Sequence, residues 1–246
     1  MTKKTKEVIE QNNKVPSYIK QGSNRGSENV EMDDYIIPRV ELLQDLSPQL
    51  KKNKPNYIPE AEAGMMFNTV TQKVYGDCVI FVPVKFKKDF LVWRDRESGG
   101  GFRGSFDSAA EANAHAEALN AEDNQKYDVV DTAQHIILVI NEDGTTDEAV
   151  LSMSRSKMKV SRNFNSLIRL NGGDRFSRTY QLTPVEDSSD KGDYWNYLIK
   201  NHSFPEKKTY LKAEKLYTDM TSGNINVKVD ETFDETGSEN NSDIPF

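Results

Sequence analysis

The chain has 246 residues, 36% of them hydrophobic and 29% charged, and a formal net charge of −7, a length sufficient for one large domain or two small ones with a substantial core. No apolar run approaches the ~20 residues of a membrane-spanning helix and the Lys-rich start lacks the apolar segment of a signal peptide, so we expect an intracellular protein without a membrane partner. One cysteine, Cys78, and three scattered histidines exclude an internal disulfide and a Cys/His zinc cluster, so we expect a buried thiol and no metal or cofactor.

The charge is segregated along the chain. From Asp107 to Val150 eleven acidic residues accompany one base, whereas from Leu151 to Tyr180 seven bases accompany one acid. A local excess of six positive charges is the electrostatic footprint that phosphate binding requires, whatever the net charge of the whole chain.

Residues 1–34 are polar, with a Lys-rich start and a Gly/Ser/Asn stretch, and we interpret them as a flexible arm. The folded domain is expected at 35–223. It begins at Tyr35 to Leu46, where Pro38 favours an edge strand or an irregular extended segment. Ser47 to Ala63, with three prolines, is expected to be a loop containing one short turn.

Two strands are predicted next, at Gly64 to Tyr75 and at Asp77 to Val92. Pro83 marks an edge or a bulge in the second strand. The alternation from Val82 to Lys87 predicts one buried face and one basic face that carries Lys85 and Lys87.

A Gly-rich loop follows, from Gly99 to Phe106, and it combines aromatic rings with arginines. Together with the preceding Trp93 to Arg96 it offers stacking faces and planar cations, a combination that suits single-stranded nucleic acid. For each of these aromatics, core packing is as good an explanation as base stacking. The glycines do not form a nucleotide-binding P-loop, because no Gly-Lys-Ser/Thr follows them.

The acidic middle of the chain predicts a surface helix and two strands. Ser108 to Ala121 is an Ala-rich helix in which Ser108 and Glu111 form a capping box. His135 to Ile140 is a buried central strand, and a turn at residues 141–144 leads to a strand at Glu148 to Leu151.

The basic segment predicts a helix from Ser154 to Leu170 that ends at a glycine pair. Its apolar positions face the core, namely Met158, Phe164, Leu167, Ile168 and Leu170. Five bases without an acid then form the outer face, which favours a phosphate contact over an ordinary solvated surface.

Two more strands and a helix complete the predicted domain. Strands are expected at Phe176 to Pro184 and at Tyr194 to Lys200, separated by a Ser/Asp/Gly loop that holds Asp187 and Asp190. A helix is expected from Pro205 to Met220, with Ser203 as its N-cap and Gly223 after its end.

Residues 224–246 are interpreted as a disordered acidic tail. From Asp230 to Phe246 there are six carboxylates and no Lys or Arg, and without these acids the chain has 32 basic and 33 acidic residues, a net charge of −1. The tip changes this pattern: Ile244 and Phe246 are suited to an apolar pocket, the terminal carboxylate to a basic group, and Pro245 lowers the entropy lost on docking.

The tip Asp243-Ile244-Pro245-Phe246 resembles the C-terminus of bacterial single-stranded DNA-binding proteins, whose acidic tail closes with Asp-Ile-Pro-Phe. The resemblance implies that the tip recruits replication and repair proteins and that the tail competes with DNA for the binding groove. It covers only the tail, and residues 240–242 (Asn-Asn-Ser) replace the usual acidic run. No bacterial family signature occurs upstream of the tail, so the whole chain looks more like a phage-type single-stranded DNA-binding protein with the same kind of tip.

These observations predict an α+β protein built around an OB-fold-like β-barrel with inserted helices. The expected function is sequence-independent binding of single-stranded DNA in replication, recombination and repair, in the host cytoplasm if the protein is phage-encoded. The residues expected to contact DNA are Lys85, Lys87, Trp93, Arg94, Arg96, Phe102, Arg103, Phe106, Arg155, Lys157, Lys159, Arg162, Arg169, Arg175, Arg178, Tyr180, Trp195 and Tyr197.

Two alternatives remain at this point. The tail also suits a phage structural or assembly protein that docks a partner through its tip. A nucleic-acid-processing enzyme is less favoured, because no spacing of nucleophile, base and orienting group stands out in the sequence.

Overall fold

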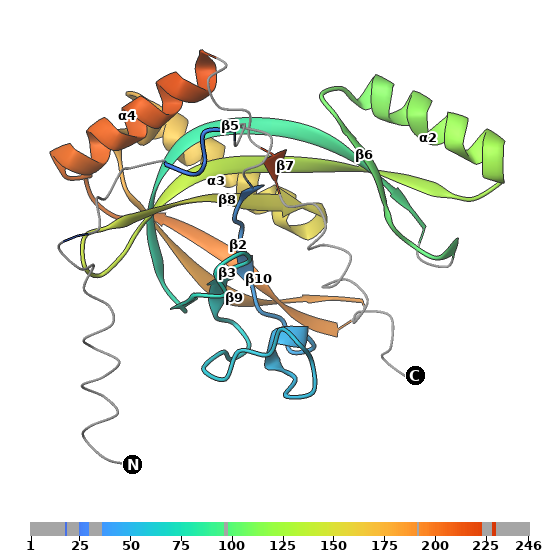
Figure 1. Ribbon diagram of the computed structural model, residues 1–246, viewed down its shortest axis with the longest axis horizontal. Helices are drawn as coiled ribbons and strands as arrows, with labels where there is room; N and C mark the ends of the chain where they lie inside the picture. The colour runs from blue at the N-terminus through green and yellow to red at the C-terminus, as the bar shows by residue number, and fades with distance from the viewer. Residues whose placement is uncertain are drawn as a thin grey trace.

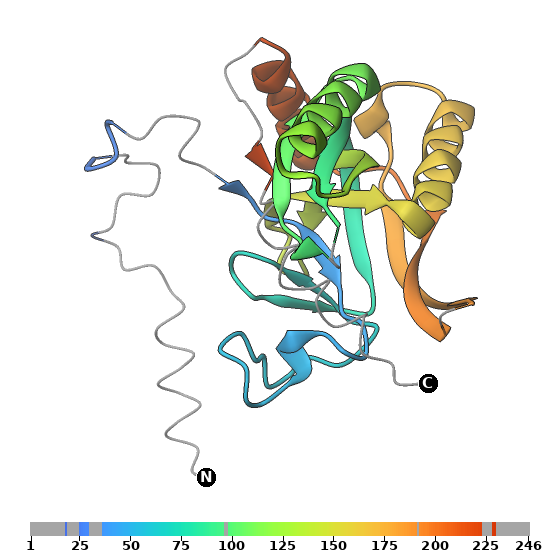
Figure 2. The same cartoon turned by 90° about the vertical axis from the view of Figure 1, so that its right-hand side faces the viewer.

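The computed structural model describes residues 18, 25–29, 36–95, 98–190, 192–222 and 228–229. Most of the predicted N-terminal arm and of the predicted acidic tail, including the tip Asp243–Phe246, lies outside these residues. The description below therefore concerns the central domain (Figures 1 and 2).

The centre of the fold is a six-stranded antiparallel sheet. The strand order is β10-β9-β5-β7-β8, and β6 pairs with the far part of β5. Strands β5 and β7 pair over almost their whole lengths and form the long curved ribbon that crosses the molecule in Figure 1. The bounds are β5 Val79–Arg94, β6 Phe102–Phe106, β7 Tyr127–Ile140, β8 Thr146–Ser154, β9 Tyr180–Ser189 and β10 Gly192–Asn201.

Smaller sheets lie beside this ribbon. Strands β2, β3 and β4 form one antiparallel sheet, and β1 pairs in parallel with β11. The bounds are β1 Ile36–Ile37, β2 Val40–Leu42, β3 Met66–Asn68, β4 Val74–Gly76 and β11 Lys228–Val229, with a short 3-10 helix η2 at Pro48–Leu50.

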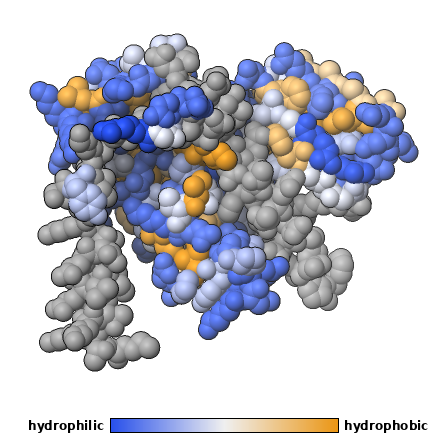
Figure 3. Space-filling model, viewed as in Figure 1, coloured by the Kyte–Doolittle hydropathy of each residue, from blue (hydrophilic) through white to orange (hydrophobic). Residues whose placement is uncertain are grey.

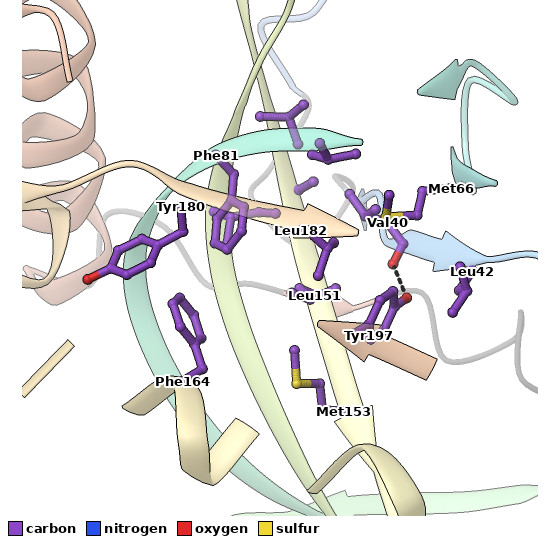
Figure 4. Close-up of a cluster of buried hydrophobic side chains, with 14 of the residues drawn as sticks. Val40, Leu42, Met66, Phe81, Leu151, Met153, Phe164, Tyr180, Leu182 and Tyr197 are labelled. Carbon is purple, nitrogen blue, oxygen red and sulfur yellow. Dashed lines mark hydrogen bonds between the residues drawn. The ribbon is translucent and has the colours of Figure 1, made fainter. Parts of the chain in front are cut away.

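Two helices cover opposite faces of the sheet. Helix α3, Met158–Asn171, follows a 3-10 turn η4, Arg155–Lys157, and packs through Phe164 on the cluster that holds Phe81, Tyr180 and Tyr197 (Figure 4). Helix α4, Lys207–Thr221, packs through Ala213, Leu216 and Met220 on a second cluster. Alternate residues of β7 divide between the clusters: Ala133, Ile137 and Val139 belong to the first, Ile136 and Leu138 to the second.

The third helix, α2, Ala109–Asp123, lies at the far end of the β5–β7 ribbon. It packs through Ala112 and Ala116 on Val92. The Ser108 half of the predicted capping box is confirmed, because the Ser108 hydroxyl accepts a hydrogen bond from the Glu111 backbone N–H. On the face shown in Figure 3, hydrophilic residues predominate over α2 and α4, and hydrophobic ones lie in small areas among them.

The α+β prediction is confirmed, but the described strands do not close into a barrel. Strands β8 and β10 are the two ends of an open sheet. The segment Pro38–Gln44 occupies both edges: the Val150 N–H donates to the Pro38 carbonyl at 2.8 Å, and the Gln44 side-chain amide both accepts from the Trp195 N–H and donates to its carbonyl, at 2.8 and 2.9 Å. These backbone groups are therefore not available for pairing β8 with β10.

Several predicted elements are confirmed with corrections. The bulge at Pro83 is present, because the register of β5 against β7 shifts between Pro83 and Lys85. The predicted strand Gly64 to Tyr75 is instead the hairpin β3–β4, because the Asn68 side chain accepts from the Val70 and Thr71 N–H groups and turns the chain. Cys78 is exposed, so the expected buried thiol is wrong.

The C-terminal elements differ from the prediction at their starts. Strand β9 begins at Tyr180, because residues 175–177 form the 3-10 helix η5, Arg175–Ser177. Strand β9 extends to Ser189 and strand β10 begins at Gly192. Asp187 therefore lies in a strand rather than in the predicted loop. Ser203 does not cap α4, because its hydroxyl bonds to the Thr179 hydroxyl and the Phe204 carbonyl instead, and Glu206 occupies the N-cap position.

Leu170 also departs from the prediction, because it is 84% exposed. At about 100° per residue it lies ~240° around α3 from the buried Phe164, on the side where Lys159 is exposed. No helix in the described part of the chain is long and apolar enough to span a membrane.

The contrast between Phe164 and Leu170 yields a stability prediction. We expect Phe164→Ala to lower the free energy of unfolding by about 3–5 kcal/mol, because its ring contacts Phe81, His135 and Tyr180 in the core. The matched variant Leu170→Ala, on the same helix, should change it by less than about 0.5 kcal/mol. Urea unfolding measures both values, and equal losses would contradict the packing of α3.

Candidate nucleic-acid interface

The outer face of α3 presents a row of cations. Lys159, Arg162 and Arg169 are exposed on the helix, and Arg155 is exposed on η4 just before it. The helical cations are spaced by three and then seven residues, and both spacings place side chains on one face of a helix. We call Arg155, Lys159, Arg162 and Arg169 the α3 stripe.

The α3 stripe lacks direct ion pairs in the described part of the chain, although, after the hydrogen bond from Asn196, the Coulombic attraction of Lys159 contributes to lowering the pKa of the Asp187 carboxylate. None of its four cations forms an ion pair within the described residues. The sequence explains this, because no acidic residue occurs between Glu148 and Asp174. Lys157, predicted to belong to the same face, instead lies near the core edge, 3.8 Å from Glu41 and 4.8 Å from the centre of the Tyr197 ring.

An exposed aromatic lies on the loop that adjoins the end of α3. The Asn171 side chain donates to Asn201 at 2.7 Å and so connects the helix end to the end of β10. In the loop after β10, Phe204 is 69% exposed and the Arg178 guanidinium lies 4.4 Å above its ring. We call Arg178 and Phe204 the Phe204 platform, because together they present an aromatic face and a cation to solvent.

Sequence reasoning identified Arg178 but missed Phe204. The residue belongs to no strand or helix, so hydrophobic periodicity gave no signal. The available signal was its position: a large aromatic in the polar stretch His202-Ser203-Phe204-Pro205, where neither strand nor helix packing accounts for it.

Arg175 is directed inward, in contrast to the stripe. Its guanidinium donates to His135 Nδ1 at 2.7 Å and to the Asn165 side-chain oxygen at 3.0 Å, and it lies 5.5 and 5.6 Å from the ring centres of Phe86 and Phe164. Burial lowers the pKa of Arg175 to about 10 and that of His135 to about 3. The arginine is charged and the histidine neutral at pH 7.

The tautomer of His135 follows from these contacts. Arginine can only donate, so His135 Nδ1 accepts and Nε2 carries the proton. The Nε2–H then donates to the Ser161 hydroxyl at 2.8 Å. This chain of hydrogen bonds fixes α3 against β7 and places Arg175 between the helix and the sheet.

Three predicted stacking residues are part of the packed interior. Tyr180 and Tyr197 are buried to 1% and 2% exposure, so their rings are not available to bases in this structure. The Tyr197 hydroxyl donates to the Val40 carbonyl (Figure 4). Trp195 is half-buried, and a Cβ atom added to Gly64, whose φ is +84°, would lie 3.3 Å from the Trp195 ring.

The Gly-rich segment forms a second, separate group. Its residues 102–106 are strand β6 rather than a loop, and the Trp93 and Phe102 rings meet edge to face at 5.4 Å. Phe106 contacts the His115 ring of α2, and Arg103 is exposed. Arg94 is half-buried, and Arg96 lies outside the described residues.

This second group is flanked by carboxylates. Lys87 pairs with Asp89 and Asp107 at 2.8 and 3.1 Å, and the neighbouring helix α2 is acidic. Lys85 lies elsewhere on β5, where its ammonium donates to the Met220 carbonyl near the end of α4. The electrostatics of the Gly-rich group are therefore less favourable to phosphate than those of the α3 stripe.

The two groups lie at different ends of the long strand β5. It pairs with β9 at Val79–Phe81 and with β6 at Phe90–Trp93. At ~3.3 Å per residue, the ends are separated by about 30–40 Å along the strand. The structure thus separates the predicted DNA-contacting residues. One group is the α3 stripe, with Arg178 in the Phe204 platform, and a second is the Gly-rich group. Others, such as Tyr180 and Tyr197, are buried.

The described residues contain no group of three or more His, Cys, Asp or Glu side chains placed to hold a metal ion. Asp187, predicted to lie in the Ser/Asp/Gly loop, accepts hydrogen bonds from the Asn196 side chain, the Ser188 N–H and the Tyr194 hydroxyl at 3.0–3.1 Å. These bonds, led by that from Asn196, lower the pKa of Asp187. Such a carboxylate holds the β9–β10 hairpin together and is a weak base.

A family model described as Pam3 phage gp34-like protein matches residues 5–226. No curated protein and no solved structure matches the chain. The matched range includes the α3 stripe, the Phe204 platform and the Gly-rich group, and it ends three residues into the predicted tail, before the six carboxylates that begin at Asp230.

The buried His135 predicts a pH dependence of stability. In the unfolded chain an imidazole with a pKa near 6.5 gains a proton as the pH falls, whereas the folded imidazole, with a pKa of about 3, stays neutral. The free energy of unfolding should therefore fall by about 1.4 kcal/mol per pH unit below pH 6.5 from this residue. Urea unfolding between pH 6.5 and 4.5 measures it.

The variant His135→Gln isolates this contribution, because glutamine can accept from Arg175 and donate to Ser161 without titrating. We expect its stability to be less dependent on pH than that of the unmodified protein. His202→Gln, at an exposed ring, controls for the loss of an imidazole. The same pH dependence in the His135→Gln variant and the unmodified protein would refute the role given to His135.

Proposed function

The chain belongs to the Pam3 phage gp34-like protein family, and we propose that it binds single-stranded DNA without sequence preference, as a non-catalytic protein of DNA replication, recombination and repair. The observation that carries the proposal is the α3 stripe, a row of exposed cations with no described ion-pair partner. Cations of this kind bind phosphates and release counterions from the nucleic acid, which favours association whatever the base sequence.

The Phe204 platform supports a preference for single strands. A base can stack on the Phe204 ring only when it is unstacked from its neighbours, which a duplex prevents. Arg178, already above the ring, supplies a cation for the adjoining phosphate or a planar group for stacking. We therefore propose that the strand follows the α3 stripe and reaches the Phe204 platform at its end.

We further propose that Asp243–Phe246 recruits replication or repair proteins, and that the acidic tail competes with DNA for the α3 stripe. Both proposals rest on the sequence, because these residues lie outside the described part of the chain. We propose that the protein acts in the cytoplasm of a phage-infected cell. The same tip supports the second candidate, a phage assembly protein that docks a partner and needs no affinity for DNA.

Neutralising the stripe tests the proposal. In the double variant Lys159→Gln/Arg162→Gln, we expect weaker binding to a labelled poly-dT oligonucleotide in fluorescence-anisotropy titrations. Each phosphate contact on a single strand contributes about 0.7 to the slope of log affinity against log salt. The variant should therefore have a slope shallower by about 1.4.

Lys52→Gln/Lys54→Gln is the matched control, because both side chains are exposed and the change in net charge is the same. This control should retain the affinity and the salt slope. A duplex of equal length should bind more weakly than the single strand. If neither substrate bound the unmodified protein, the assembly protein would be the better account.

Variants at two phenylalanines test whether the Phe204 platform or the Gly-rich group stacks bases. We expect Phe204→Ala to weaken oligonucleotide binding by about 5- to 150-fold, which corresponds to ~1–3 kcal/mol for one stacked base, with little loss of stability since the ring is exposed. Phe102→Ala, in the Gly-rich group, should have a much smaller effect. The reverse order of effects, measured in the same titration, would move the interface to the β5–β6 hairpin.

A further inference from the structure

A cleft of about 500 Å³ lies next to the end of α3, between β5 and the last turns of α4. Its wall includes Lys85 and Phe86 from β5, Tyr217 and Thr221 from α4, and Gly173 and Arg175 from the segment that follows α3. These residues come from three regions of the sequence, and no motif connects them.

The cleft is lined by two cations and one carboxylate. Arg175 has no carboxylate partner among the described residues: it bonds to a neutral imidazole and an amide, and its Nε has no hydrogen-bond partner there. The Lys85 ammonium donates to a backbone carbonyl of α4. The single carboxylate, Asp174, is exposed and lies 3.4 Å from the Tyr210 hydroxyl. The site therefore favours an anion.

Two aromatic rings in the wall are partly open to solvent. Phe86 is 37% and Tyr217 is 41% exposed. Each is held by neighbouring side chains: Phe86 contacts His135 and the Arg175 guanidinium, and Tyr217 contacts the buried Phe176. Rings that are held by neighbours and are partly exposed suit the stacking of a planar group.

The cleft and the α3 stripe are close together in the sequence. Arg169, the last cation of the stripe, is four residues before Gly173 in the cleft wall. The cleft therefore adjoins the segment that follows the C-terminal end of α3, the helix that carries the stripe. An anion joined to a planar ring is the chemistry of a nucleotide.

We propose that this cleft binds one nucleotide of the bound single strand, an inference that rests on the proposed function. The phosphate lies near Lys85 and Arg175, and the base stacks on Phe86 or Tyr217. The cleft thus adds a defined nucleotide position to an interface that otherwise contacts the strand along an open helix surface.

Two measurements on the full chain test this proposal. The first is photocrosslinking of a poly-dT oligonucleotide containing 5-iododeoxyuridine, with the crosslinked residue identified by mass spectrometry. The second is saturation-transfer NMR with thymidine 5′-monophosphate, which detects a nucleotide site independently of the rest of the strand. The variants are Tyr217→Leu and Lys85→Gln, with Leu211→Ala on the same helix and Lys88→Gln on the same strand as matched controls.

We expect crosslinks at Phe86 or Tyr217. We also expect at least about tenfold weaker binding of the mononucleotide in both cleft variants but not in the controls. Thermal unfolding confirms that each variant is folded. If oligonucleotide binds while crosslinks lie elsewhere and the mononucleotide is unaffected, the cleft proposal is overturned and the proposed function stands. If the mononucleotide binds through these residues but no oligonucleotide binds, the proposed function fails and the cleft remains a nucleotide site. If neither the mononucleotide nor the oligonucleotide binds, both the cleft proposal and the proposed function are overturned.

Discussion

The fold depends on one extended segment, Pro38–Gln44, that satisfies backbone groups on both edges of the main sheet. Pro38 accepts from Val150 on β8, and the Gln44 amide bonds to both backbone groups of Trp195 on β10. Unpaired strand edges invite association with other chains, so occupying them is a constraint on any open sheet. Between these contacts the Val40 side chain is fully buried and its carbonyl accepts from Tyr197. The segment thereby fixes β8 and β10, the strands on which α3 packs.

The packing of α3 determines which cations reach solvent. Once Phe164 is buried against Phe81 and Tyr180, helical geometry turns Lys159, Arg162 and Arg169 outward. The remaining bases of the same segment have other surroundings: Lys157 lies over Tyr197, Arg175 bonds to His135, and Arg178 covers Phe204. Bases that follow one another in the sequence therefore have three different surroundings. Some are exposed on α3, Arg175 lies between the helix and the sheet, and Arg178 lies over the ring of the exposed Phe204.

Local patterns in the sequence predict the elements better than their assembly. The bulge at Pro83, the Ser108 cap and the buried strand at His135 follow from residues close together in the chain, and all three are present. The hairpin at Asn68 was missed because a side-chain turn interrupts a run of strand-forming residues. The prediction of a closed barrel was wrong because closure requires β8 to pair with β10, about 50 residues away in the sequence. No local pattern reveals that Gln44 occupies the edge of β10.

The misassigned tyrosines have a mechanistic consequence. An aromatic on a strand stacks bases only if its face of the sheet is open, and α3 covers the face that carries Tyr180 and Tyr197. In the proposed DNA interface, stacking is therefore assigned to residues outside the sheet core, such as Phe204 in a loop and Tyr217 on a helix, which are partly or largely exposed. Such an interface has more cations than stacking rings. Because the cationic part weakens with salt and the stacking part does so much less, salt should govern the affinity more strongly than it would for a sheet lined with aromatics.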